Sequence, residues 1–231
     1  MCSRISQPDD VLMYAGLLGW HSRSLRLIAA QADWPSFNAA PRLERLVFRV
    51  IDGKPTADLV RWECQSDWAK ERGLAGSTRL KCRDVEHPRY RDLLEHGRVI
   101  VPVKGWFEWT EEEGERQPWY VTGKSGLPLY LAAVCNYHPH HAGQEGNGFM
   151  LLTDNGTGGT VSSENRAPVV LSAQNARDWM NPDLKPEQAY TIASRNAIVS
   201  HSDLKWYRVS SAVNSVEAHG QGLIEPAGIY A

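Results

Sequence analysis

Runs of apolar and β-branched residues dominate the middle of the chain and predict β-strands. The runs at 46–51 and 57–64 are joined by Asp52-Gly53, which is typical of a tight hairpin turn. Polar residues at 111–117 predict another turn between two strands. Further β-rich runs predict strands at 98–103, 106–109, 118–122, 127–137, 149–153, 169–171 and 206–213.

Short amphipathic segments between these runs predict helices. Asp10 precedes one helix that Gly19 ends, and Ser172 precedes another that runs to Met180. Two more helices are predicted at 89–96 and 186–193. Strands and helices do not alternate regularly, so the sequence predicts an α+β fold. We expect one domain over residues 1–231, with a mixed, mostly antiparallel, barrel-like sheet and peripheral helices.

Composition narrows the class of protein. The 231 residues are 42% hydrophobic, and the formal net charge is −2, so a protein that coats duplex DNA is excluded and any nucleic-acid site must be a local patch. No apolar run could span a bilayer, and the N-terminus lacks a secretory signal. We therefore expect a cytoplasmic monomer without metal or cofactor. The four cysteines form no C-x-x-C pair and indicate a reducing compartment: Cys2, Cys64, Cys82 and Cys135.

The second residue, Cys2, carries the most distinctive chemistry. Removal of Met1 would leave an N-terminal Cys, with an α-amine of pKa about 7.7–8.0 beside a thiol of pKa about 8.5. Such a pair reacts with an aldehyde in two steps, because the amine forms an imine and the sulfur then closes a thiazolidine ring. Taken alone, a Cys at this position is usually no more than a small residue after the initiator Met.

Three motifs accompany Cys2. They are Phe37-Asn38-Ala39-Ala40-Pro41, Gly105-Trp106-Phe107-Glu108-Trp109, and Trp206-Tyr207-Arg208-Val209-Ser210 followed by Val213-Asn214. Together with the beginning Met1-Cys2-Ser3-Arg4, they resemble the SRAP (SOS response-associated peptidase) family of abasic-site-processing proteins. The resemblance covers nearly the whole chain.

The resemblance implies an enzyme that crosslinks itself to DNA, in a family also described as peptidases. Its members bind an abasic site in single-stranded DNA and trap the ring-opened sugar as a thiazolidine. By position, Cys2 matches the crosslinking residue, Asn38 the Asn beside the sugar, and Glu108 the acid that moves protons. Without the other motifs, Glu108 would be interpreted as an outward-facing strand residue and Asn38 as a turn residue.

A basic stretch at residues 79–91 indicates where the DNA phosphates would lie. Arg83 matches a phosphate-contacting Arg of the family, and Trp68 is expected to stack on a base beside the lesion. The alternative is an ordinary charged helix face with Trp68 in the core. The predicted DNA-binding residues are Arg4, Trp68, Lys81, Arg83, Arg89 and Thr153.

Some positions depart from the family pattern. Lys81 stands where the family has Asn, Ser3 where it has Gly, and Glu164 where it has an acid–base His. We hypothesise that Glu164 partly takes over the role of that His. Two other functions stay open: a thiol peptidase, or autopeptidase, that uses Cys2, and a binding-only relative that has lost crosslinking.

Overall fold

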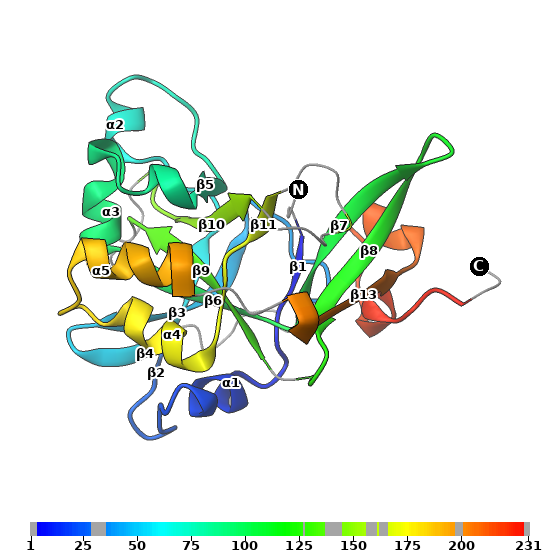
Figure 1. The fold of residues 1–231 in the computed structure, drawn as a ribbon, viewed down its shortest axis with the longest axis horizontal. Helices are drawn as coiled ribbons and strands as arrows, with labels where there is room; N and C mark the ends of the chain where they lie inside the picture. Colours follow the sequence, from blue (N-terminus) through cyan, green and yellow to red (C-terminus); the bar gives the residue numbers. More distant parts are fainter. Residues whose placement is uncertain are drawn as a thin grey trace.

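The larger of two β-sheets lies at the centre of the molecule (Figure 1). The computed structural model describes residues 4–28, 36–126, 128–136, 145–155, 161, 166–196 and 201–228. Within them this sheet has nine strands in the order β11-β10-β9-β6-β3-β4-β2, with β12 beside β9 and β5 beside β10. The pairs β2–β4 and β5–β10 are parallel and the other pairs antiparallel. The strands are β2 (Arg26–Leu27), β3 (Glu44–Ile51), β4 (Lys54–Arg61), β5 (Arg79–Lys81), β6 (Arg98–Val103), β9 (Leu129–Cys135), β10 (Phe149–Asn155), β11 (Arg166–Pro168) and β12 (Val170–Leu171).

The smaller sheet is antiparallel and has the order β1-β7-β8-β13. Its strands are β1 (Ile5–Ser6), β7 (Gly105–Glu112), β8 (Glu115–Gly123) and β13 (Leu204–Arg208). The long β7–β8 hairpin projects to the right in Figure 1. The sequence predicts a polar turn over 111–117, but the turn is only Glu113-Gly114, both with positive φ. Cross-strand pairing continues through Glu112 and Glu115 because two residues suffice for a tight hairpin.

Helices cover one face of the larger sheet, where Figure 1 shows α3, α4 and α5 together. The predicted helix starts are confirmed: Asp10 accepts a hydrogen bond from the Met13 amide at 2.8 Å, and Ser172 accepts one from Asn175 at 3.2 Å. The α-helices are α1 (Val11–Leu17), α2 (Asp67–Lys70), α3 (Arg91–His96), α4 (Ala173–Met180) and α5 (Pro186–Thr191). Short 3-10 or π turns are η1 (Cys82–Asp84), η2 (Pro88–Tyr90), η4 (Ile192–Asn196), η5 (His201–Asp203), η6 (Ser211–Asn214) and η7 (Gln221–Ile224).

Strand β6 is buried on both faces and shows how the core is divided. Alternate side chains of a strand point to opposite faces. Ile100 packs into the cluster with the helices, whereas Val99 and Val101 join the cluster that contains Trp106 of the smaller sheet. The larger sheet is therefore the middle layer between the helices and the smaller sheet.

The chain leaves the smaller sheet earlier than the sequence predicts. The predicted strand at 206–213 is instead β13 followed by η6. The Ser210 hydroxyl accepts a hydrogen bond from the Ala212 amide at 3.2 Å, which favours a turn over further pairing with β8. The α+β fold with a mostly antiparallel sheet is otherwise confirmed. None of the described helices is long and apolar enough to span a membrane.

Candidate functional site

The N-terminal arm is tied to both sheets through β1. Ile5 exchanges two backbone hydrogen bonds with Ala39, at 3.1 and 2.8 Å. The Gln7 side-chain amide binds both backbone groups of Leu46 in β3, at 2.9 and 3.1 Å. On the other side, the Arg4 carbonyl accepts a hydrogen bond from the Phe107 amide of β7 at 3.0 Å. Arg4 therefore continues the pairing of β1 with β7.

The Arg4 side chain is buried, with only 9% of the residue exposed. Its Nη1 donates to Asn38 Oδ1 at 2.6 Å and to the Val213 carbonyl at 3.0 Å, and its Nη2 donates to the Asn214 carbonyl at 3.4 Å. Burial lowers the pKa of the Arg4 guanidinium, and the charge of Arg116 lowers it further. The group that the sequence assigns to DNA phosphates thus contacts acceptors of the protein itself.

Asn38 holds Arg4 from the other side. Its amide nitrogen donates to the carbonyls of Ser215 and Ala218 at 2.8 and 3.1 Å, while its oxygen accepts from Arg4. The residue is 6% exposed. A buried amide must find partners for both ends, and Asn38 does so by joining the arm to a segment far along the chain.

Glu108 is a buried carboxylate on β7, 1% exposed. It lies two residues after Trp106, so both side chains share one face of the strand, and Trp106 Nε1 donates to Glu108 Oε1 at 2.9 Å. The interpretation of Glu108 as an outward-facing strand residue is therefore wrong. Arg4, Asn38 and Glu108 form what we call the N-terminal corner.

Two predicted catalytic residues, Cys2 and Glu164, lie outside the described residues. Cys2 stands two positions before Arg4 in the sequence, and Glu164 two positions before Arg166, the first residue of β11. After these two gaps, the described chain begins again at Arg4 and at Arg166.

A second set of predicted residues meets where β5, β10 and β11 lie side by side. Thr153 of β10 is opposite Lys81 of β5 in the parallel pair and opposite Pro168 of β11. The Thr153 hydroxyl is buried, donates to the Leu80 carbonyl at 3.3 Å and accepts from Arg166 Nη2 at 2.9 Å. Arg166, two residues after Glu164, is not among the site residues that the sequence predicts.

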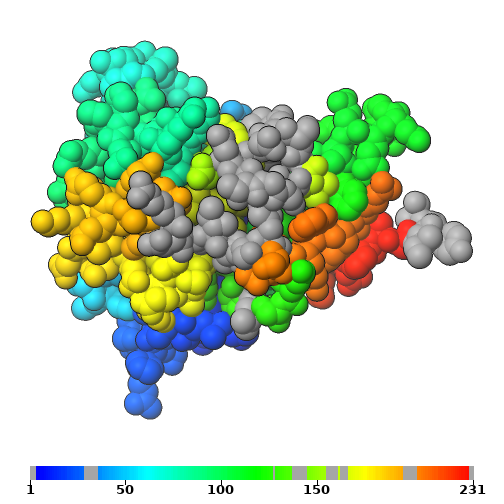
Figure 2. Space-filling model, in the orientation of Figure 1, coloured from blue at the N-terminus to red at the C-terminus, as the bar shows by residue number. Residues whose placement is uncertain are grey.

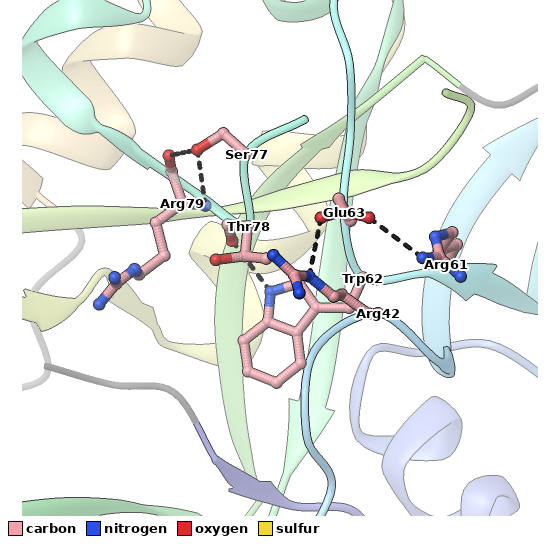
Figure 3. Close-up of polar contacts among 7 residues, drawn as sticks. All are labelled: Arg42, Arg61, Trp62, Glu63, Ser77, Thr78 and Arg79. Carbon is pink, nitrogen blue, oxygen red and sulfur yellow. Dashed lines mark hydrogen bonds and ion pairs between the residues drawn. The ribbon is translucent and has the colours of Figure 1, made fainter. Parts of the chain in front are cut away.

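Trp62 is a core residue that anchors the start of β5 (Figure 3). It is fully buried, stacks on Phe149 with ring centroids 6.0 Å apart, and donates from Nε1 to the Thr78 carbonyl at 2.9 Å. Around it, the Glu63 carboxylate accepts from Arg42 and Arg61, both at 3.1 Å. The Trp therefore fixes the strand that carries Lys81.

Comparisons with known proteins identify the family of the chain. The family described as SOS response associated peptidase (SRAP) matches residues 1–216. The chain belongs to the SRAP family.

Among SRAP relatives, the abasic site processing protein YedK of Escherichia coli K12 is 30% identical over 190 residues, which cover 82% of this chain and 84% of that protein. The abasic site processing protein YoaM of Bacillus subtilis is 24% identical, covering 83% and 85%. Among solved structures, a phage-related protein of Bordetella bronchiseptica has a TM-score of 0.75 at 25% identity, covering 90% and 94%. The SRAP fold therefore extends over nearly the whole chain.

Trp68 lies in a basic cluster of this SRAP protein. The Arg72 and Arg89 guanidinium carbons lie 4.7 and 5.0 Å from its ring centroid, and Arg89 also lies 4.9 Å from the Tyr90 ring. The cluster joins α2 to η2, within the segment that forms the upper left of the surface in Figure 2. The contact brings together two of the predicted DNA-binding residues, Trp68 and Arg89, and Arg72 is a neighbour that the sequence does not indicate.

Arg83 is an exposed cation among the predicted DNA-binding residues. Its side chain is 64% exposed and lies 3.7 Å from Asp84, while Lys81 is half-buried at the start of η1. We call Trp68, Lys81, Arg83 and Arg89 the basic rim. Exposed arginines with one weak partner can turn toward a phosphate at little cost.

The other three thiols are poor nucleophiles. Cys64, Cys82 and Cys135 are buried, and burial raises the pKa of Cys82 to about 12 and that of Cys64 still higher. Across the described residues, no three His, Cys, Asp or Glu side chains are grouped as a metal site would require. The described part of the chain thus leaves Cys2 as the candidate nucleophile.

Proposed function

We propose that this SRAP protein captures abasic sites in single-stranded DNA through Cys2 once Met1 has been removed. Curated relatives that share about four fifths of the chain carry the name abasic site processing protein. The observation that carries the proposal is the hydrogen bond of 3.0 Å between the Arg4 carbonyl and the Phe107 amide. It pairs Arg4, which stands two positions after Cys2 in the sequence, with the strand residue next to Glu108.

The capture reaction balances without an external reagent. The Cys2 amine adds to the aldehyde carbon of the opened sugar, and the carbinolamine loses water to give an imine. The thiol sulfur then bonds to the imine carbon, and the thiol proton passes to nitrogen, closing the thiazolidine. Ring opening and loss of water both need a proton donor or acceptor at the sugar.

Glu108 is our candidate for that proton transfer. It is buried, and the hydrogen bond from the Trp106 indole fixes the carboxylate without supplying a charge. Glu164 is our second candidate, because it stands where the family has an acid–base His, two positions before Arg166 in the sequence. Arg4 and Asn38 then serve as positioning residues, because their polar groups are already engaged within the protein.

The basic rim is our candidate for holding the strand. Lys81 and Arg83 would contact phosphates next to the lesion, with Arg166 and Thr153 beneath them, and Trp68 would stack on a neighbouring base. This proposal needs only a local positive surface, so it is compatible with the net charge of −2.

Intact-mass analysis tests the function directly. The full chain is incubated with a single-stranded oligonucleotide that carries one abasic site, and masses are read after denaturation. We expect an adduct only on chains that lack Met1, smaller by one water than the sum of its parts. Full removal of Met1 without adduct would favour the binding-only relative, whereas cleavage of peptide substrates that depends on Cys2 would favour the peptidase.

A further inference from the structure

The segment 213–218, which begins in the last residues of η6, packs over the N-terminal corner. Four of its carbonyl groups accept hydrogen bonds from just two side chains: those of Val213 and Asn214 from Arg4, and those of Ser215 and Ala218 from Asn38. Val213 is itself fully buried in a cluster with Phe107 and Tyr120. The position of Arg4 therefore depends on how this distant segment is held.

The Asn214 side chain holds the segment against both strands of the β7–β8 hairpin. Its Oδ1 accepts from Trp109 Nε1 at 2.6 Å, and its Nδ2 donates to the Arg116 carbonyl at 3.2 Å. Trp109 follows Glu108 directly on β7, and the Arg116 guanidinium lies 5.3 Å from the Trp109 ring. One amide thus fixes the segment relative to the strand that carries Glu108.

We propose that Asn214 is a positioning residue for the capture reaction, acting through Arg4; this inference rests on the proposed function. The Asn214 side chain fixes the position of the Val213 and Asn214 carbonyls. These carbonyls accept hydrogen bonds from the Arg4 guanidinium and so fix its position. The Arg4 backbone is thereby held against Phe107, next to Glu108. None of these contacts needs DNA, so the corner is organised before the lesion arrives. Errors of about 1 Å between reacting groups cost orders of magnitude in rate, which makes such a distant residue matter.

The test compares capture rate with DNA affinity in the full chain. Asn214→Ala removes both hydrogen bonds, and Trp109→Phe removes only the donor to Oδ1 while keeping an aromatic ring. Trp119→Phe is the matched control, because it removes an indole hydrogen bond of the same hairpin, from Trp119 Nε1 to Thr110 at 2.9 Å, whose acceptor lies outside the segment. The capture rate is measured at saturating oligonucleotide, together with the half-saturating oligonucleotide concentration. The hydrogen-exchange rate of the Phe107 amide is measured without DNA.

We expect Asn214→Ala to slow capture about tenfold at saturation, while the half-saturating concentration changes less than twofold. Trp109→Phe should give a smaller loss. The double variant should be no slower than Asn214→Ala, because the hydrogen bond that Trp109→Phe removes is already absent in Asn214→Ala. The Phe107 amide should exchange faster in both variants and not in Trp119→Phe.

Unchanged exchange at Phe107 would overturn the structural link, and faster exchange with unchanged capture would overturn its role in the reaction. Equal losses in affinity and in rate would identify a DNA-contact role instead. A wild-type chain that forms no adduct would overturn the proposed function. The hydrogen-exchange measurement involves no DNA, so it tests the structural link separately from the proposed function.

Discussion

The N-terminal corner and the basic rim use polar residues in opposite ways. In the corner, Arg4, Asn38 and Glu108 are at most 9% exposed, and each has a hydrogen-bond partner within the protein. In the rim, Arg83 is largely exposed and pairs only with its neighbour Asp84. A buried, hydrogen-bonded set is rigid and suits chemistry that needs fixed geometry, whereas exposed cations adapt to a flexible strand. The comparison predicts that corner variants change rates and rim variants change affinity.

Replacing the nucleophile should have the largest effect. Cys2→Ala is expected to abolish covalent capture, because no other residue offers an adjacent amine and thiol, while leaving reversible DNA binding within about twofold. The measurement is intact mass after denaturation, with binding followed by fluorescence anisotropy. Cys82→Ala is the control that should still form adduct, since its buried thiol has a pKa of about 12 and stays protonated near neutral pH. Adduct on Cys2→Ala would contradict the proposal.

Glu108→Gln should have the next largest effect. The amide keeps the size of the side chain and can still accept from Trp106, but it cannot transfer a proton, so we expect capture to slow by about a hundredfold. DNA affinity should not change. Glu112→Gln lies on the same strand and loses only a pairing with Arg208 at the surface, so it serves as the control. A Glu108→Gln chain that captures at the wild-type rate would remove Glu108 from the mechanism.

A variant of Arg4 tests whether the N-terminal corner acts on the capture rate and not on DNA binding. Arg4→Gln leaves buried carbonyls without a donor, and we expect a loss of about 1–3 kcal/mol in the free energy of unfolding. Capture should slow at saturating DNA, whereas the salt dependence of binding should not change. Denaturant titration and binding at several salt concentrations measure the two effects. A shallower salt dependence would instead place Arg4 on a phosphate, as the sequence predicts.

Arg83→Gln should have the smallest effect and should act on affinity alone. We expect a few-fold weaker binding and a salt slope reduced by about 0.7, the value for one phosphate contact with single-stranded DNA. Arg42→Gln, which loses an exposed ion pair with Glu63, is the matched control. If both variants bind alike, the DNA does not reach Arg83.

Local signals account for much of the fold. The Asp52-Gly53 hairpin, with both residues at positive φ, and the helices after Asp10 and Ser172 are visible in the sequence because each depends on neighbours in the chain. The end of β13 is not visible in the sequence, because it depends on where pairing with the distant strand β8 stops. Which strands join to form two sheets is likewise a matter of long-range packing.

The candidate site divides in the same way. The motif around Glu108 identifies the carboxylate, but not its burial or its bond to Trp106. Two partners of Arg4, the carbonyls of Val213 and Asn214, stand 209 and 210 positions away, so no local pattern connects them to Arg4. Spacing also leaves Trp62 and Trp68 alike, although one is a fully buried anchor and the other lies among arginines. Residue types are thus predictable, whereas their partners are not.

The joining of Arg4 and Asn38 to residues 213–218 has a consequence for how the protein is made. The first residues leave the ribosome long before these late partners are synthesised, and domains fold as their parts become available. During translation the N-terminal corner therefore cannot close, because Arg4 and Asn38 still lack these partners. The corner forms only after residue 218 has been synthesised, which makes its closure a late step in folding.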